Sequence, residues 1–130
     1  MARDSQLLSC IAALGVRDHL LDRGIDTGIK LPNDVWTGGR KICGLLIENI
    51  LDGKSVRESI IGVGLNVNQE SWPGDLPNPV SMKQISGKEY DLREELARLR
   101  DCIGRRAAMI GSDEGRRCLM EEFDNNTIIR

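Results

Sequence analysis

The sequence predicts an α+β fold, in which an antiparallel or mixed β-sheet carries helices packed on one face. Two observations support this class. Apolar residues recur at helical spacing near the N-terminus and again after residue 91, whereas residues 25–68 contain short apolar or alternating runs separated by glycine-rich turns. A strand-rich middle is thus flanked by helical segments, and the length of 130 residues fits one domain.

We divide this domain, residues 1–130, into four segments. Residues 1–24 are expected to form a helix, residues 25–68 a β-meander that bears the candidate site, residues 69–80 a loop, and residues 81–130 helices. The loop holds three of the four prolines, which is typical of an ordered surface connection.

The composition argues against several classes of protein. The net charge is −2 and charges of both signs are interspersed, which argues against a nucleic-acid binder that relies on general basicity. No stretch is long and apolar enough to span a bilayer, and we find no secretory signal. The four cysteines are widely spaced, so we expect no zinc site and no disulfide framework, but the reduced thiols of a cytoplasmic protein.

The first helix is predicted from a stripe of apolar residues at helical spacing: Leu7, Leu8, Ile11, Leu14 and Leu20. Asp4 or Ser5 can cap its N-terminus, and Gly24 can end it. His19 falls near the end of this helix, where we expect a structural rather than a catalytic histidine.

A glycine pair at residues 38–39 predicts the first hairpin of the sheet. Gly-Gly supplies the positive φ angles that a two-residue hairpin turn requires. Such a turn sets Trp36 opposite Lys41 and Asp34 opposite Cys43. These four side chains are therefore expected on one face of the sheet.

A second hairpin is predicted at residues 52–53, and its pairing sets Lys41 against Gly64 and Cys43 against Gly62. The returning strand alternates an apolar row with a row of glycine and asparagine: Ile61, Val63, Leu65 and Val67 against Gly62, Gly64, Asn66 and Asn68. Period-two alternation places these rows on opposite faces. Since glycine within a strand often marks the close approach of a ligand, the sequence predicts a bare floor beside Lys41.

Such a floor suits a flat ligand that carries an anionic group. Lys30 and Lys41 can each neutralise a phosphate or a carboxylate. Asp34 could hold a Mg²⁺ ion that bridges phosphate oxygens, and Asn66 can both donate to and accept from an adenine edge. The alternative interpretation is that both lysines are solvated and that the glycines only accommodate a bulge.

Helices are expected after the loop. Ser81 can cap a short helical turn, and Asp91 can cap a long helix with an apolar stripe. Gly111 ends this helix, and residues 112–113 begin the next. The tail at residues 127–129 is predicted to be the start of a strand.

Three motifs follow one another in the middle of the chain. They are Lys-Leu-Pro-Asn-Asp at residues 30–34, Lys-Ile-Cys-Gly-Leu-Leu at 41–46 and Gly-Val-Gly-Leu-Asn-Val-Asn at 62–68. In order and spacing they resemble the Lys-Trp-Pro-Asn-Asp, Lys-(Ile/Leu)-(Ala/Cys)-Gly-Ile-Leu and Gly-Ile-Gly-Ile-Asn-Val-Asn segments of the biotin protein ligases. The resemblance runs from the first helix to the C-terminus and implies part of the biotin and lipoate ligase catalytic fold.

The resemblance implies a two-step, ATP-dependent ligase. Biotin and ATP would give biotinyl-5'-adenylate, and a lysine of a biotin carboxyl carrier domain would then take the biotin. Lys41 would be the catalytic residue, because it matches the family lysine that contacts the biotin carboxylate and the adjoining phosphate.

The resemblance also implies the residues that bind the substrates: Lys30, Asn33, Asp34, Gly62, Gly64 and Asn66. Lys30 would contact the ATP phosphates, while Asn33 and Asp34 would organise the phosphates and Mg²⁺, with Asp34 as the metal ligand. The two glycines would lie under biotin, and Asn66 would touch the adenine.

The chain departs from the family pattern in several places. Leu31 stands where the family has tryptophan, which removes an aromatic packing group. We do not find the arginine- and glycine-rich biotin loop, the C-terminal β-barrel or the helix-turn-helix of the DNA-binding ligases. We therefore expect a partial catalytic domain that does not bind DNA and that is weakly active or inactive.

Two other functions stay open at this point. A lipoate-protein ligase has a similar fold and a Lys-x-x-Gly element, although the first and third motifs favour biotin. Alternatively, the chain is a non-catalytic remnant that binds a nucleotide or a partner, or that forms a homodimer through an unpaired strand edge.

Overall fold

The computed structural model describes residues 2–74 and 78–128. The elements, in chain order, are α1 (Ala2–Asp22), β1 (Gly28–Lys30), β2 (Asp34–Thr37), β3 (Arg40–Asp52), β4 (Ser55–Leu65), α2 (Met82–Ser86), α3 (Leu92–Ala108), the 3₁₀ turn η1 (Met109–Gly111) and α4 (Asp113–Asn125). Among the described residues, the helices fall short of the length and apolarity that crossing a membrane requires.

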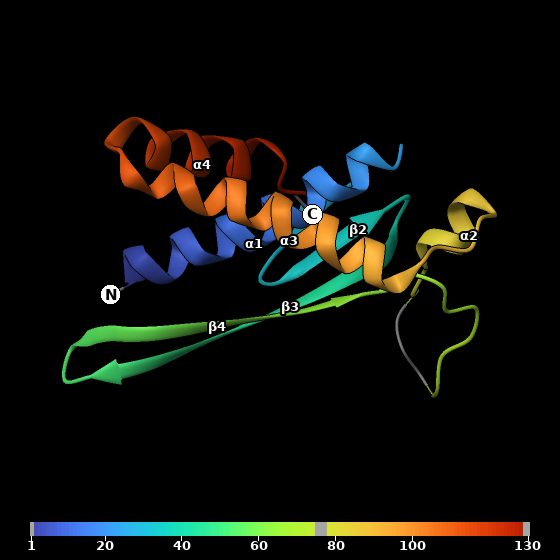
Figure 1. Ribbon diagram of the computed structural model, residues 1–130, viewed down its shortest axis with the longest axis horizontal. Helices are drawn as coiled ribbons and strands as arrows, with labels where there is room; N and C mark the ends of the chain where they lie inside the picture. Colours follow the sequence, from blue (N-terminus) through green and yellow to red (C-terminus); the bar gives the residue numbers. More distant parts are fainter. Residues whose placement is uncertain (1, 75–77, 129–130) are drawn as a thin grey trace.

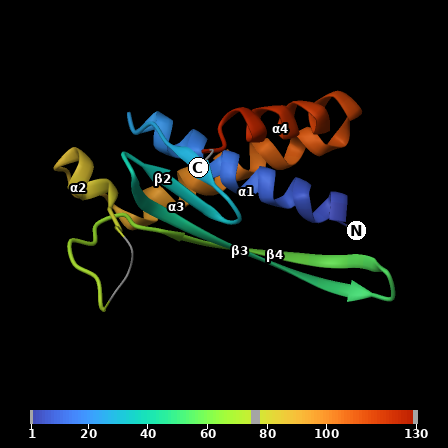
Figure 2. The same cartoon turned by 180° about the vertical axis from the view of Figure 1, so that it is seen from behind.

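The strands form one antiparallel sheet in the order β1-β2-β3-β4. Helices α1, α3 and α4 lie together on one side of it, and the long β3–β4 hairpin extends beneath them (Figure 1). The view from behind shows the same two layers (Figure 2). The predicted α+β class, with helices on one face of the sheet, is confirmed.

Helix α1 forms the centre of the hydrophobic core. Its buried side chains include Leu7, Cys10, Ile11, Leu14, Val16 and Leu20. At Gly15 a Cβ atom would lie 2.6 Å from Cγ1 of Ile103, so only glycine permits this close crossing of α1 and α3. The predicted end at Gly24 is confirmed by its φ of 78°, but the predicted cap at Asp4 or Ser5 is wrong because α1 already begins at Ala2.

A β-bulge corrects the predicted register of the first hairpin. Trp36 pairs with Lys41 as expected. Val35, which precedes Trp36 in β2, pairs with Cys43 and not with Ile42, so Ile42 is the extra residue in β3. Asp34 therefore faces Gly44 and not Cys43. Because of the bulge, the consecutive residues Ile42 and Cys43 both point into the core, where each is 0% exposed.

The predicted register of the second hairpin is also wrong. Asp52 pairs with Ser55, so the turn residues are 53–54 and not 52–53, and a further bulge lies between Ile50 and Leu51. Together these shift the pairing by three residues. As a result Gly64 pairs with Gly44, and Gly62 pairs with Leu46.

The predicted caps of the later helices are confirmed. Ser81 accepts a hydrogen bond from the Gln84 amide and forms a capping box at α2. Asp91 accepts from two amides at the start of α3, and Ser112 accepts from the Gly115 amide at α4. The long helix ends at Ala108, three residues before the predicted Gly111, because a 3₁₀ turn intervenes.

The C-terminal tail joins the outer edge of the sheet. Thr127 forms a parallel bridge with Ile29, and the Ile128 amide donates to the Ile29 carbonyl at 2.7 Å. The predicted strand at residues 127–129 is thus a short parallel pairing with β1 as far as residue 128, while residue 129 lies outside the described residues.

Two ionic clusters, one partly exposed and one largely buried, join α1 and the residue after it to the C-terminal helices. Arg106 of α3 binds Asp18 of α1, with Nε 2.7 Å from Oδ2, and Glu122 of α4, with Nη2 2.9 Å from Oε2. In the second cluster, Glu95 of α3 binds His19 of α1 and Arg23, which follows α1 directly.

The second cluster explains why His19 is structural. Its ring and the Glu95 carboxylate are 0% and 3% exposed, and Nε2 lies 2.9 Å from Oε1. Burial lowers the pKa of His19, although the Glu95 charge opposes this effect. Arg23 supplies the cation that Glu95 requires in the interior.

Replacing Glu95 with alanine should lower the free energy of unfolding by about 3 kcal/mol, because it leaves the buried His19 ring without its partner and removes the closer of the two carboxylates from the partly buried Arg23. Urea denaturation followed by circular dichroism measures this change. Glu94→Ala is the matched control, since the exposed Glu94 pairs with the same Arg23 at 3.7 Å and should contribute less than about 1 kcal/mol. Equal losses for the two variants would contradict the assignment.

Candidate active site

Lys41 and Asp34 form an ion pair on the outer face of the sheet, away from the helices. The Lys41 Nζ lies 3.2 Å from Asp34 Oδ1, and the two side chains are 37% and 30% exposed. Both therefore remain accessible to a ligand. The predicted proximity of this cation and this carboxylate is confirmed.

Gly44 lies directly beneath the Lys41 side chain. A Cβ atom at this position would be 3.3 Å from both Cε and Nζ of Lys41, so glycine leaves the room in which the lysine rests. Gly44 was not predicted to be a site residue, because without the bulge at Ile42 a residue three positions from Lys41 belongs to the opposite face. Its signal was the Lys-x-x-Gly element itself.

The paired glycines Gly44 and Gly64 form a bare strip next to this ion pair. At Gly64 the nearest heavy atom to an added Cβ is the Gly44 carbonyl oxygen at 3.5 Å. Gly62 lies one position farther along this face, beside the exposed Leu46. The structure thus groups Lys41, Asp34 and Gly64 as predicted, adds Gly44, and places Gly62 at the border.

Lys30 occupies a second environment, on the aromatic ring of Trp36. Its Nζ lies 3.9 Å from the ring centroid. The two residues line a cavity of about 340 Å³ together with Gly39, Asn78 and Ile128. Trp36 Nε1 is buried there with no hydrogen-bond partner among the described residues.

Asn33 lines a different cavity from Lys30. Its carbonyl accepts a hydrogen bond from the Leu45 amide at 2.8 Å, which holds the corner after Pro32 against β3. Its side chain lines a different cavity, of about 480 Å³, bordered by α1 and the end of α4 and including Phe123. Asn33 thus enters the described geometry through its backbone, next to Asp34, and through a cavity that Lys30 does not line.

The side-chain amide of Asn66 is hydrogen-bonded to the backbone. Its Nδ2 donates to the Val80 carbonyl at 3.1 Å and lies 3.5 Å from the Lys41 carbonyl oxygen. These bonds use the donor side of the amide. Recognition of an adenine edge would use both a donor and an acceptor, and only the acceptor Oδ1 of Asn66 remains for a ligand.

Cys43, next to the site in sequence, cannot act as a nucleophile. It points into the core, and burial raises the pKa of its thiol to about 12. Burial likewise raises the pKa of Cys10 to about 11. Within residues 2–74 and 78–128, no group of three acidic, histidine or cysteine side chains could hold a metal by itself.

Comparison with known proteins points to one family. Models of protein families give no match. The bifunctional ligase/repressor BirA of Bacillus spizizenii is 38% identical over 103 residues, which cover 76% of this chain and 32% of that protein. The chain thus spans about a third of the length of this relative.

Solved structures give the same answer. The biotin protein ligase of Aquifex aeolicus without ligands superposes with a TM-score of 0.78 and 24% identity, over 94% of this chain and 53% of that one. The same enzyme in complex with biotin and ATP gives a TM-score of 0.63 and 27% identity, over 76% and 41%. By sequence and fold, the chain belongs to the biotin protein ligase family and matches a part of its members.

The rate at which each cysteine is alkylated should follow the burial of its thiol. We expect iodoacetamide to modify the partly exposed Cys118 of the native protein first, and to leave Cys10 and Cys43 unmodified because their thiolates are scarcely populated. Peptide mass spectrometry identifies the modified sites, and all four cysteines should react in urea. Early modification of Cys43 in the native protein would contradict its placement in the core.

Proposed function

We propose that this chain provides the ATP and biotin half-site of a biotin protein ligase, or biotin-[carboxyl carrier protein] ligase. The observation that carries the proposal is the position of Lys41, above Gly44 and beside Asp34, within motifs that match the family. It places a cation over a surface free of side chains, where a flat molecule with a carboxylate can lie.

The first step of the proposed reaction joins biotin to the nucleotide. A biotin carboxylate oxygen attacks the α-phosphorus of ATP, the bond to the bridging oxygen breaks, and pyrophosphate leaves. Negative charge on the carboxylate and the α-phosphate converges in this step. An ammonium group such as that of Lys41 stabilises this charge and lowers the barrier.

The second step transfers biotin to its acceptor. The neutral amine of a lysine on a biotin carboxyl carrier domain attacks the carbonyl carbon of biotinyl-5'-adenylate. The amide forms, AMP leaves with the electrons of the carbonyl–oxygen bond, and a proton is released. This chain contributes the surface on which the adenylate is held.

The remaining residues take the following proposed roles. Lys30 would bind ATP phosphates at the cavity shared with Trp36, and Asn66 would accept a hydrogen bond from adenine through Oδ1. A Mg²⁺ ion that accompanies ATP commonly takes one carboxylate together with phosphate oxygens, and Asp34 is the carboxylate that fits this need. Asn33 would support the phosphate region through the backbone corner that it forms with β3.

The chain matches about a third of the length of its Bacillus relative. We propose that it binds biotin weakly and turns over slowly or not at all as an isolated chain. Its proposed partner is a biotin carboxyl carrier domain, and its proposed small-molecule ligands are biotin and ATP.

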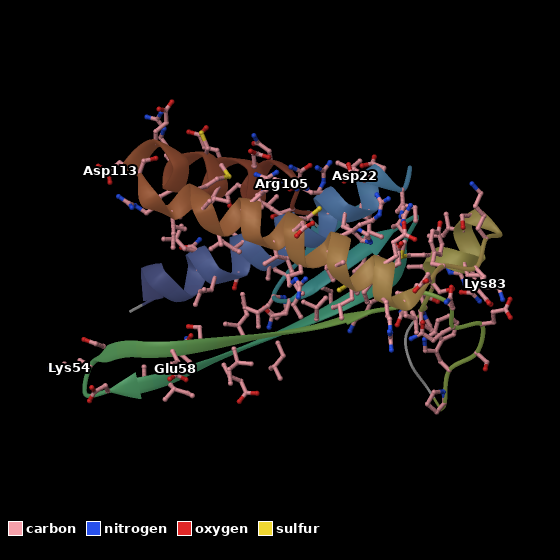
Figure 3. All side chains as sticks on the ribbon, in the orientation of Figure 1. Asp22, Lys54, Glu58, Lys83, Arg105 and Asp113 are labelled. Atoms are coloured by element: carbon pink, nitrogen blue, oxygen red, sulfur yellow. The ribbon has the colours of Figure 1, made fainter. Side chains whose placement is uncertain are left out.

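Replacing Lys41 with alanine should reduce formation of biotinyl-adenylate about a hundredfold, because the developing charge loses its cation. The assay follows pyrophosphate release from ATP and biotin, and streptavidin blotting of a carrier domain reports the transfer. Lys54→Ala is the matched control, since Lys54 lies at the tip of the β3–β4 hairpin, far from the candidate site (Figure 3).

A chain without measurable turnover is tested by binding instead. Titration with biotinyl-adenylate that carries a sulfamoyl group in place of the phosphate should give at least tenfold weaker affinity for Lys41→Ala than for Lys54→Ala. Equal affinity would contradict the role of Lys41. Preferential transfer of lipoate would favour a lipoate ligase, and turnover like that of an ordinary ligase would contradict the expected low activity.

Replacing Gly64 with valine should abolish binding of the same analogue while the fold is kept. A Cβ at this position meets only the Gly44 carbonyl at an ordinary 3.5 Å, and a β-branched residue suits a strand. The control is Gly104→Ala on α3, where an added Cβ meets nothing within 4 Å. Thermal unfolding and titration of both variants make the test, and unchanged affinity of Gly64→Val would contradict the glycine floor.

A further inference from the structure

Asn66 connects the strands of the site to a segment outside the sheet. It follows β4 directly, and its Nδ2 donates to the Val80 carbonyl at 3.1 Å. Its own carbonyl accepts from the Met82 amide at 3.0 Å. The side chain and the carbonyl of Asn66 thus bind the segment 78–81 and the start of α2 to the end of β4.

The 78–81 segment in turn holds the backbone of Lys41. The Lys41 amide donates to the Asn78 carbonyl at 2.8 Å, and the Val80 amide donates to the Lys41 carbonyl at 2.9 Å. Both backbone groups of Lys41 are therefore bonded to this segment. Asn78 also lines the cavity that contains Trp36, so the segment touches both parts of the candidate site.

We propose that Asn66 is a positioning residue, whose side-chain amide keeps the 78–81 segment in register with Lys41 and so holds Lys41 at a fixed place relative to the Trp36 cavity. This role uses the Nδ2 donor, whereas a contact to adenine would use the Oδ1 acceptor. The inference rests on the proposed function only in taking Lys41 as the cation of the site.

The position of Asn66 requires a side chain that donates hydrogen bonds. Nδ2 faces two backbone carbonyl oxygens, those of Val80 and Lys41, and only an N–H group can serve both. Aspartate has the same shape but would place a carboxylate oxygen against these carbonyls. The exchange of asparagine for aspartate therefore removes the positioning function and keeps an acceptor at the place of Oδ1.

Asn68, two residues after Asn66, provides a matched control for the loss of the Asn66 side chain. Its Nδ2 donates to the Tyr90 carbonyl at 2.8 Å, and its Oδ1 accepts from the Tyr90 amide at 2.9 Å. It thus holds the segment before α3 as Asn66 holds the segment before α2. Loss of the Asn68 side chain costs similar hydrogen bonds without touching Lys41.

The test measures backbone opening and the surroundings of Trp36 in Asn66→Ala, Asn66→Asp and Asn68→Ala. Amide hydrogen exchange by NMR should be roughly fivefold faster at Lys41 and Val80 in both Asn66 variants, since one hydrogen bond is lost. The emission of Trp36, recorded in a Trp72→Phe background, should shift in the same two variants. Asn68→Ala should change exchange at Tyr90 alone.

Each of several results would overturn the proposal. Parent-like exchange at Lys41 and Val80 in the Asn66 variants would show that Asn66 positions nothing, and an effect of Asn66→Ala without one of Asn66→Asp would show that the donor is not the group involved. Equal effects of Asn68→Ala on Lys41 would reveal general destabilisation. Neither measurement uses biotin or ATP, so an inactive chain would leave this test unaffected.

Discussion

The bulge at Ile42 is the constraint on which the candidate site depends. In a regular strand, residues three apart point to opposite faces, so Lys41 and Gly44 would be separated by the sheet. The extra residue turns both toward the outer face and sends Ile42 and Cys43 together into the core. The same local irregularity therefore supplies the core with two side chains and the site with its cation.

The bare strip around Gly44 and Gly64 is a place where function and stability compete. Glycine in a strand gives up side-chain packing and has a high conformational entropy when unfolded. The opposite face compensates, because Leu45 and the apolar residues of β4 pack under the helices. Helix α1, which fills the core and binds α3 and α4 through ionic clusters, stabilises a sheet that can leave its outer face open.

The site has two parts with different electrostatics. Lys41 is neutralised by Asp34 in a half-exposed pair, which a ligand anion can enter by displacing or bridging the carboxylate. Lys30 rests on the aromatic ring of Trp36 and pairs with no carboxylate among the residues that the structure describes, so its charge is available to an anion. The 78–81 segment lies between these parts and contacts both. Its attachment to the sheet is thus a condition for their common geometry.

The sequence by itself determined the features that depend on local chemistry. The caps at Ser81, Asp91 and Ser112 follow from how side chains satisfy the free amides of a helix terminus, and the end of α1 near Gly24 follows from the positive φ angle that glycine allows. The α+β class and the proximity of Lys41 to Asp34 followed from periodicity and from the Gly-Gly turn. The motifs also identified the family that the comparisons found.

Only the tertiary structure decided the register of the strands and the partners of the polar side chains. The bulge at Ile42 costs local pairing but places Ile42 and Cys43 together in the core, which the strand sequence does not reveal on its own. The second bulge, between Ile50 and Leu51, adds to the shift in register of the β3–β4 hairpin. The Nδ2 of Asn66 donates to Val80, fourteen residues away, a partner that the sequence did not predict and that is there because the loop returns to the sheet. Long-range packing chooses such partners, and for that reason they cannot be read from neighbouring residues.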